Sequence, residues 1–183
     1  MRLIYCITAL LILPSIQEDP CGGKNRWDVK TLTDISARSM SYKKIGSSIR
    51  KLRTIKAPSN ITNSLVRQPE EKNLYSITCY ITEYKIEEYG DFQLVLMYTK
   101  DSNITMVGEI PDPECGVMID CPKLVDIQTV RNEFYNKYRM PKKRVAPGKY
   151  QVTGMFFFDK PHGQLGGAPN GAELHPILSI KKL

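Results

Sequence analysis

The sequence predicts a β-rich α+β fold built on a small closed barrel of five strands. Two observations support this prediction. Runs rich in Ile, Thr, Val and aromatic residues alternate with turns that contain Gly, Pro and Asp through the last 110 residues or so. One amphipathic helical segment interrupts these runs after the third strand. Closure of such a small sheet would remove its exposed edges.

The expected elements follow one another as three strands, a helix and two strands. The strands are expected at Leu74–Ile86, Phe92–Thr99, Ile104–Ile110, Tyr150–Phe158 and Glu173–Ile180. The helix is expected at Val125–Tyr138, where Val130, Phe134 and Tyr138 are four apart and share one face. This order is that of a five-stranded OB-like barrel. A ferredoxin-like sandwich would need a helix after the first strand, and none is expected there, so the OB-like arrangement is preferred.

The start of the chain has the pattern of a secretory signal peptide. A positive start at Arg2 precedes the apolar run Leu3–Leu13, which Pro14 interrupts. The run is shorter than the roughly 20 residues of a membrane-spanning helix. We assign residues 1–17 to the signal and expect a secreted or periplasmic protein with no stable membrane insertion after signal removal.

The segment between the signal and the barrel is expected to be an extension, since it has too few large apolar residues for its own core. We assign residues 18–73 to the extension and 74–183 to the barrel. Within the extension, Trp27–Thr31 is expected to be a short strand, and Ile45–Leu52 to form one or two helical turns.

Cysteine usage and net charge add two expectations. Cys115 and Cys121 bracket a short loop and are the most economical disulfide pair in an exported protein, whereas Cys79 could equally be a buried thiol. The spacing is not that of a zinc site. The formal charge of +7 favours an anionic partner such as a nucleic acid or another acidic polymer.

Both histidines of the chain lie in the closing segment HGQLGGAPNGAELHP, His162–Pro176. On a strand, residues two apart point to the same face, so Glu173 shares a face with His175, and Asp91 with Gln93. In an OB-like barrel these two pairs could converge at one end.

Three interpretations of this convergence remain open. The groups could form a purely structural polar network in a secreted protein. A histidine beside a carboxylate could instead act as a general base in a hydrolase such as a phosphodiesterase. The candidate catalytic residues are then His162, His175, Glu173 and Asp91.

The third interpretation is binding without chemistry, which we prefer because it demands less of the geometry. The loop before the last strand flanks the ligand face of OB barrels. The candidate ligand-binding residues are Gln93, Gln164, Asn170 and Lys149, and the expected ligand is an anionic or polymeric molecule, a nucleic acid or a glycan. Two imidazoles and a glutamate could also bind zinc, but a long loop separates them, so we predict no metal site and no particular cofactor.

The chain resembles a family of small exported bacterial proteins without an assigned function. The resemblance covers nearly all of the mature chain and rests on Trp27–Thr31, Gly90–Gln93, Glu109–Cys115 and His162–Pro176. Gln93 stands where the family pattern has histidine. The resemblance implies no activity.

A weaker resemblance links the segment from Asp91 to Glu114 with staphylococcal-type nucleases, which are OB barrels. In that family, carboxylates at places similar to Asp91, Asp112 and Glu114 hold calcium, and two arginines stabilise the phosphate. This chain has no match for those arginines, and Glu173 and His175 stand near the second of them. The resemblance therefore implies the fold more than the nuclease activity.

Overall fold

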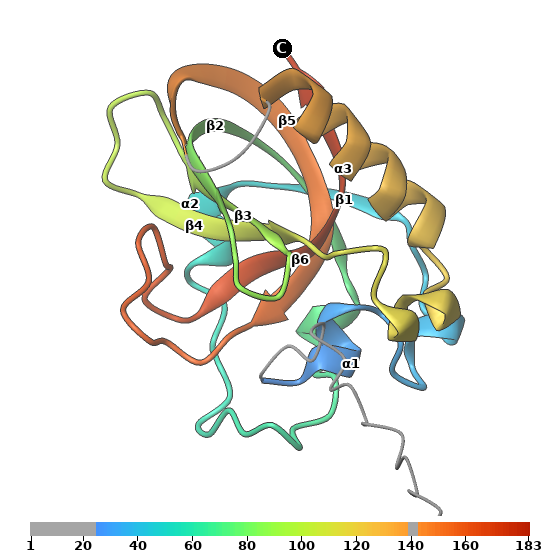
Figure 1. Ribbon diagram of the computed structural model, residues 1–183. Helices are drawn as coiled ribbons and strands as arrows, with labels where there is room; N and C mark the ends of the chain where they lie inside the picture. Colours follow the sequence, from blue (N-terminus) through green and yellow to red (C-terminus); the bar gives the residue numbers. More distant parts are fainter. Residues whose placement is uncertain (1–24, 139–142) are drawn as a thin grey trace, which may run out of the picture.

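The protein folds as a closed, mixed five-stranded barrel with one additional strand. The computed structural model describes residues 25–138 and 143–183. The barrel strands are β2 (Leu74–Ile86), β3 (Phe92–Met97), β4 (Thr105–Ile110), β5 (Lys143–Phe158) and β6 (Ala172–Lys182). They are hydrogen-bonded in the order β2-β3-β4-β6-β5, and antiparallel pairing of β5 with β2 closes the barrel (Figure 1).

The predicted OB-like architecture is thereby confirmed. The helix α3 (Leu124–Tyr138) lies between β4 and β5 in the chain, and β4 runs parallel to β6. Ile127, Val130 and Phe134 are the buried face of α3, and Tyr138 is partly buried beside them, so the predicted face of Val130, Phe134 and Tyr138 packs on the core. The strand β5 begins seven residues earlier than expected, at Lys143 rather than Tyr150 (150 − 143 = 7).

The extension differs from its predicted secondary structure. Trp27–Lys30 is a turn of helix, α1, and not a strand, because the Thr31 hydroxyl and amide both donate to the Trp27 carbonyl and close the turn. The Lys44–Ser47 segment is the strand β1, which pairs in parallel with β2. Helix begins only at Ile49, in α2 (Ile49–Leu52). Short 3-10 turns complete the described elements at η1 (Ala37–Ser39), η2 (Glu70–Lys72) and η3 (Gly116–Asp120).

The expected Cys115–Cys121 disulfide is wrong, because Cys121 carries a free thiol. The 3-10 turn η3 occupies the segment between these residues. A 3-10 turn rises about 2.0 Å per residue, which does not favour the close approach of two Cα atoms that a disulfide needs. Cys79 is a buried free thiol in β2.

The extension contributes to the same hydrophobic core as the barrel. Leu32, Ala37, Ile49 and Leu52 are fully buried in it. Phe157, which points away from the barrel interior relative to its neighbours on β5, is also fully buried, and the cationic groups of Arg26 and Lys30 lie 4.9 and 5.2 Å from its ring centre.

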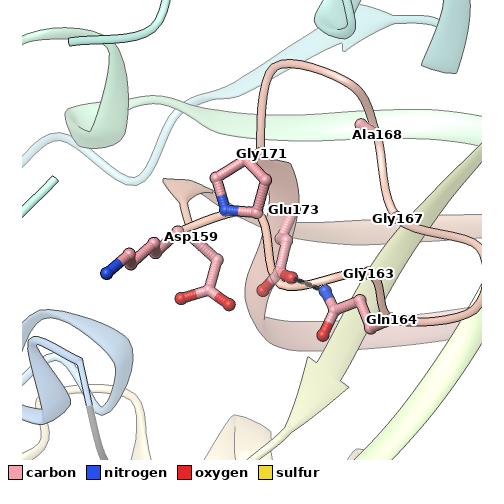
Figure 2. Close-up of a pocket in the computed structure, with 9 residues that line it drawn as sticks. Asp159, Gly163, Gln164, Gly167, Ala168, Gly171 and Glu173 are labelled. Carbon is pink, nitrogen blue, oxygen red and sulfur yellow. Dashed lines mark hydrogen bonds between the residues drawn. The ribbon is translucent and has the colours of Figure 1, made fainter. Parts of the chain in front are cut away.

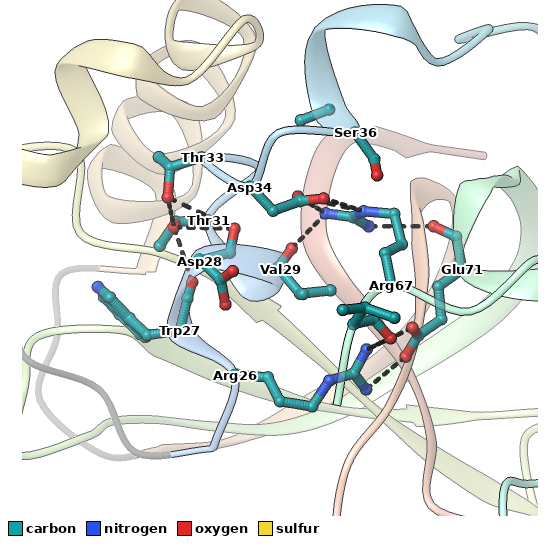
Figure 3. A network of polar contacts seen from close by, with 12 residues as sticks. Arg26, Trp27, Asp28, Val29, Thr31, Thr33, Asp34, Ser36, Arg67 and Glu71 are labelled. Carbon is teal, nitrogen blue, oxygen red and sulfur yellow. Dashed lines mark hydrogen bonds and ion pairs between the residues drawn. The ribbon is translucent and has the colours of Figure 1, made fainter. Parts of the chain in front are cut away.

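A network of buried ion pairs holds the extension together (Figure 3). We call Arg26, Asp34, Arg67 and Glu71 the extension network. Arg26 donates to both carboxylate oxygens of Glu71, and Arg67 donates to both oxygens of Asp34. Glu71 also accepts from the Phe158 amide, which joins the extension to β5.

The proposed signal peptide, residues 1–17, lies outside the described residues. Within the described parts of the chain, the structure contains no helix that is both long and apolar enough to cross a membrane.

Candidate functional site

Four ionisable side chains, from two strands and from the residue just before a third, meet at one end of the barrel. Asp91 directly precedes β3, Glu109 is on β4, and Glu173 and His175 are on β6. We call these four residues the barrel-end cluster. The pairing register brings them together, because Gln93 is opposite Glu109, and Val107 is opposite Glu173. Their side chains are almost completely buried, with 0–4% of the surface exposed.

The imidazole of His175 is at the centre of the cluster. Its Nδ1 atom lies 3.0 Å from Glu109 Oε2 and 4.0 Å from Glu173 Oε2. Its Nε2 atom lies 3.8 Å from Asp91 Oδ2 on the other side of the ring. The imidazole therefore has carboxylates on both sides.

The cluster leaves several of its buried polar atoms without a hydrogen bond. Asp91 Oδ2, Glu173 Oε2 and His175 Nε2 have no hydrogen-bond partner among the described residues. An unpaired buried polar group costs roughly 1–3 kcal/mol, so native proteins rarely keep several together without a function. This cluster therefore differs from an ordinary structural network.

One oxygen of each carboxylate in the cluster is held by a neighbouring amide. Gln93 Nε2 donates to Glu109 Oε1 at 3.1 Å, and the Asp112 amide donates to Asp91 Oδ1 at 2.9 Å. Gln164, from the closing loop, donates through its side-chain amide to Glu173 Oε1 (Figure 2). The surrounding chain thus fixes one oxygen of each carboxylate and leaves the other free.

Lys30 and Asp159 flank the cluster on the side of the extension. Lys30 Nζ lies 3.6 Å from Asp159 Oδ1, and both side chains are at least nine-tenths buried. Burial alone would lower the pKa of Lys30, but the carboxylates of Glu109, Glu173 and Asp159 raise it above its ordinary value. Lys30 therefore provides a permanent positive charge.

Burial and mutual repulsion separate the acidities of the carboxyl groups. Burial, reinforced by the charge of Glu109, raises the pKa of Asp91 to about 8 and that of Glu173 well above its usual range. Burial alone would also raise the pKa of Glu109. The His175 imidazole and the Lys30 ammonium outweigh this effect and lower the pKa of Glu109 to about 2. Glu109 is therefore the most acidic of these three carboxyl groups, whereas Asp91 and Glu173 retain their protons to higher pH than ordinary carboxyl groups do.

The cluster is reached from a surface cavity of about 420 Å³, which we call the barrel-end cavity. Its lining includes Lys30, Lys85, Gln93, Glu109 and His162. A smaller cavity of about 170 Å³ lies under the closing loop (Figure 2). It reaches Glu173 and shares Asp159, Gly163 and Gln164 with the first.

The closing loop, between β5 and β6, is anchored at both ends. The Asp159 amide donates to the Gly171 carbonyl at 2.8 Å, and Gly171 has a φ of +71°. A Cβ atom at this glycine would lie 2.1 Å from the Asp159 carbonyl oxygen. Only glycine therefore allows the two ends to approach closely.

The structure separates the predicted site residues into two groups. Asp91, Glu173 and His175 meet in the barrel-end cluster, and Gln93 and Gln164 contact it. His162 lies on the cavity rim instead, with 52% of its side chain exposed and Nδ1 3.4 Å from Asp159 Oδ2.

The other two predicted residues lie away from the cluster. Asn170 donates to the carbonyls of Leu52 and Ile55, so its side chain ties the closing loop to the extension. Lys149 is exposed on β5, eight residues before Phe157, which pairs with Glu173 (157 − 149 = 8).

Sequence reasoning missed Glu109 and Lys30 as members of the site. Both stand in the segments Glu109–Cys115 and Trp27–Thr31, which carry the bacterial-family resemblance. It also missed Arg131, whose guanidinium donates to the Gly90 carbonyl and lies 3.8 Å from the Phe92 ring centre. Arg131 thereby fixes the backbone that presents Asp91.

The residues do not fit the calcium set implied by the nuclease resemblance. Asp112 Oδ2 lies 3.4 Å from Arg131, and its other oxygen accepts from the Glu114 amide. The Glu114 side chain is exposed. Among the described residues, the group whose donor atoms could hold a metal ion is instead Asp91, Glu109 and His175.

Comparisons with known proteins leave the chain without an assigned family. It matches no protein-family model and no curated protein. Among solved structures it is similar to a "putative aspartyl-tRNA synthetase" from Leishmania major Friedlin, at 12% identity and a TM-score of 0.41. The match covers 78% of this chain but only 21% of that protein. A likeness this weak carries no argument about function.

Proposed function

We propose that this protein is a hydrolase that binds its substrate in the barrel-end cavity and activates water at the buried cluster. The observation that carries the proposal is the position of unpaired, buried acid–base groups directly behind an accessible cavity. Perturbed ionisable groups in a cleft are typical of active sites.

The cavity wall supplies the groups that the proposed reaction needs. Glu109 is ionised, lines the cavity and contacts His175. It can therefore accept a proton from a water molecule in the cavity, while His175 keeps the carboxylate oriented. Gln93, which donates to Glu109, holds the same carboxylate from the other side.

Two lysines of the cavity lining offer cationic contacts to a small anionic substrate group. Each is also paired with a carboxylate of the same lining, Lys30 with Asp159 and Lys85 with Glu87. Lys30 and Lys85 both line the cavity, and His162 adds an imidazole. A phosphate ester would place its negative oxygens against these groups and its leaving group toward solvent. The charge of the whole chain, +7, assists the approach of such a substrate.

The test is hydrolysis of three nitrophenyl substrates, a phosphodiester, a phosphomonoester and an acetate ester, by wild type and Glu109→Gln. We expect turnover of a phosphate ester and a decrease in kcat of about 10²-fold or more in the variant. Glu114→Gln is the matched control, because it removes an exposed acid from the neighbouring segment. Absence of hydrolysis in wild type, or equal rates in Glu109→Gln, would contradict the proposal.

Binding of an anionic polymer without chemistry is the second candidate. It is favoured by a separate groove of about 440 Å³ beside β1, which is lined by Lys43, Lys72 and three serines. The carboxylates of the barrel-end cavity disfavour a polyanion there. The test is the affinity for single-stranded DNA. Equal affinities in wild type and Glu109→Gln, which decrease steeply as salt rises, would favour binding at the groove over binding in the cavity.

A further inference from the structure

We infer that Asp91, Glu109 and His175 bind one divalent transition-metal ion behind the wall of the barrel-end cavity, where Glu109 is part of the lining. The inference rests on the proposed function in assigning the ion to the hydrolytic site. It replaces the earlier expectation that the chain has no metal site.

The donor atoms already converge. One ligand atom from each of the three side chains lies within 4.8 Å of the other two. Asp91 directly precedes β3, and Glu109 and His175 are on β4 and β6, so the pairing of these strands fixes their separation. Donor atoms placed on strands hold a site more firmly than donors on loops.

A second observation points to a ligand in this place. Asp91 and His175 have fully buried side chains, and Asp91 Oδ2 and His175 Nε2, 3.8 Å apart, have no hydrogen bond among the described residues. Two buried polar atoms that face each other without a hydrogen bond are costly in a protein interior. A cation between them would satisfy both.

The charges around the cluster also favour a cation. Four carboxyl groups and one ammonium group meet here: Asp91, Glu109, Asp159, Glu173 and Lys30. If all four carboxyl groups were ionised and the imidazole neutral, the formal charge would be −3 (four negative, one positive), and a bound dication would reduce it to −1. Lys30 is paired with Asp159, which limits its repulsion of the ion.

The ligand types indicate the class of metal. Imidazole together with carboxylates suits zinc, manganese or ferrous iron, whereas calcium takes only oxygen ligands. Three protein ligands leave a position for water, as in catalytic zinc sites. The amides of Gln93 and Asp112 already orient the two carboxylates from outside, in the way that supporting hydrogen bonds orient metal ligands.

The experiment is titration of the chelator-treated full chain with Zn²⁺, Mn²⁺ and Ca²⁺ by calorimetry, with Co²⁺ as a spectroscopic probe. We expect one equivalent of Zn²⁺ or Mn²⁺ to bind, with much weaker binding of Ca²⁺. The Co²⁺ spectrum should show d–d bands without the charge-transfer band of a thiolate, which excludes Cys79 and Cys121 as the ligands.

Glu109→Gln and Asp91→Asn are the test variants, because both preserve side-chain shape. Each should raise the Kd at least 100-fold, while Glu114→Gln should leave it unchanged. Circular dichroism checks that the variants are folded, and His175→Gln provides a third variant if one of them is not. Failure of wild type to bind, or equal affinity in the variants, would overturn the inference.

The metal site and the hydrolase can fail separately. Stoichiometric binding without hydrolysis of any substrate would support the metal site and contradict the proposed activity. Hydrolysis that persists unchanged after complete removal of metal would support the proposed activity and contradict the assignment of the ion to the hydrolytic site.

Discussion

The extension network and the barrel-end cluster are both buried groups of charged side chains, but they differ in how their atoms are satisfied. In the extension network, both oxygens of Glu71 accept hydrogen bonds from Arg26, and they also accept from the amides of Gln68 and Phe158. In the barrel-end cluster, Asp91 and His175 each keep a buried atom with no bond.

The difference distinguishes structural from functional burial of charge. A fully bonded ion pair needs nothing from outside, and its removal leaves one charge uncompensated. An incompletely bonded cluster is destabilising until something binds to it. The extension network therefore stabilises the fold, whereas the barrel-end cluster is maintained at the expense of stability.

The largest effect should come from breaking the extension network with Glu71→Ala. Arg26 has no exposed side-chain surface and would keep an unpaired charge. We expect a loss of about 3–5 kcal/mol in the free energy of unfolding, measured by urea denaturation. Glu70→Ala, one residue away and partly exposed, should change it by less than about 0.5 kcal/mol. Similar losses in both variants would show that the buried ion pair of Glu71 contributes no special stability.

An effect of opposite sign, smaller per pH unit and spread over several pH units, is expected for Asp91→Asn. The pKa of Asp91 is about 8 in the folded protein and about 3.9 when unfolded. The folded state then binds the extra proton between these values, so this group makes wild type less stable as the pH rises from about 4 to 8. Its contribution is at most about 1.4 kcal/mol per pH unit.

The asparagine variant lacks this titration, so its unfolding free energy should fall less steeply with pH and exceed that of wild type at pH 8. Urea denaturation at pH 5–8, with chelator present, measures both slopes. Asp28→Asn, which changes an exposed aspartate, should keep the wild-type slope. Parallel profiles for wild type and Asp91→Asn would show that Asp91 ionises normally.

The smallest effect is expected at an exposed pair outside both regions. Arg38 and Asp120 lie 2.8 Å apart, with 73% and 64% of their side chains exposed. Arg38→Ala should change the unfolding free energy by less than about 0.5 kcal/mol. A loss approaching that of Glu71→Ala would mean that burial is not what separates these ion pairs.

The barrel could be predicted from local patterns because its strands and helix carry their own periodicity. The alternation in Leu74–Ile86 and the four-residue spacing of Val130 and Phe134 are visible without tertiary contacts. The extension has no such pattern. Trp27–Lys30 forms a helical turn through the bonds of Thr31, and a composition of mixed polar and apolar residues did not distinguish this from a strand.

The site was predictable only for residues that share a strand. Glu173 and His175 are two apart on β6, and side chains alternate between the two faces of a strand, so the sequence predicted that these two share a face. Glu109 and Lys30 join them through barrel closure and through the docking of the extension, which no local spacing encodes. His162 was expected with His175 because it lies in the same segment, but the closing loop carries it to the rim.

The two hydrogen bonds from Asn170 to the carbonyls of Leu52 and Ile55 determine how short a fragment of the chain can be while it still holds the site intact. A fragment starting at Leu74 would contain every strand of the OB barrel, yet its closing loop would lose this anchor and its cavity would lose Lys30. A graft onto another protein must therefore begin no later than Arg26, so the working unit is longer than the barrel alone.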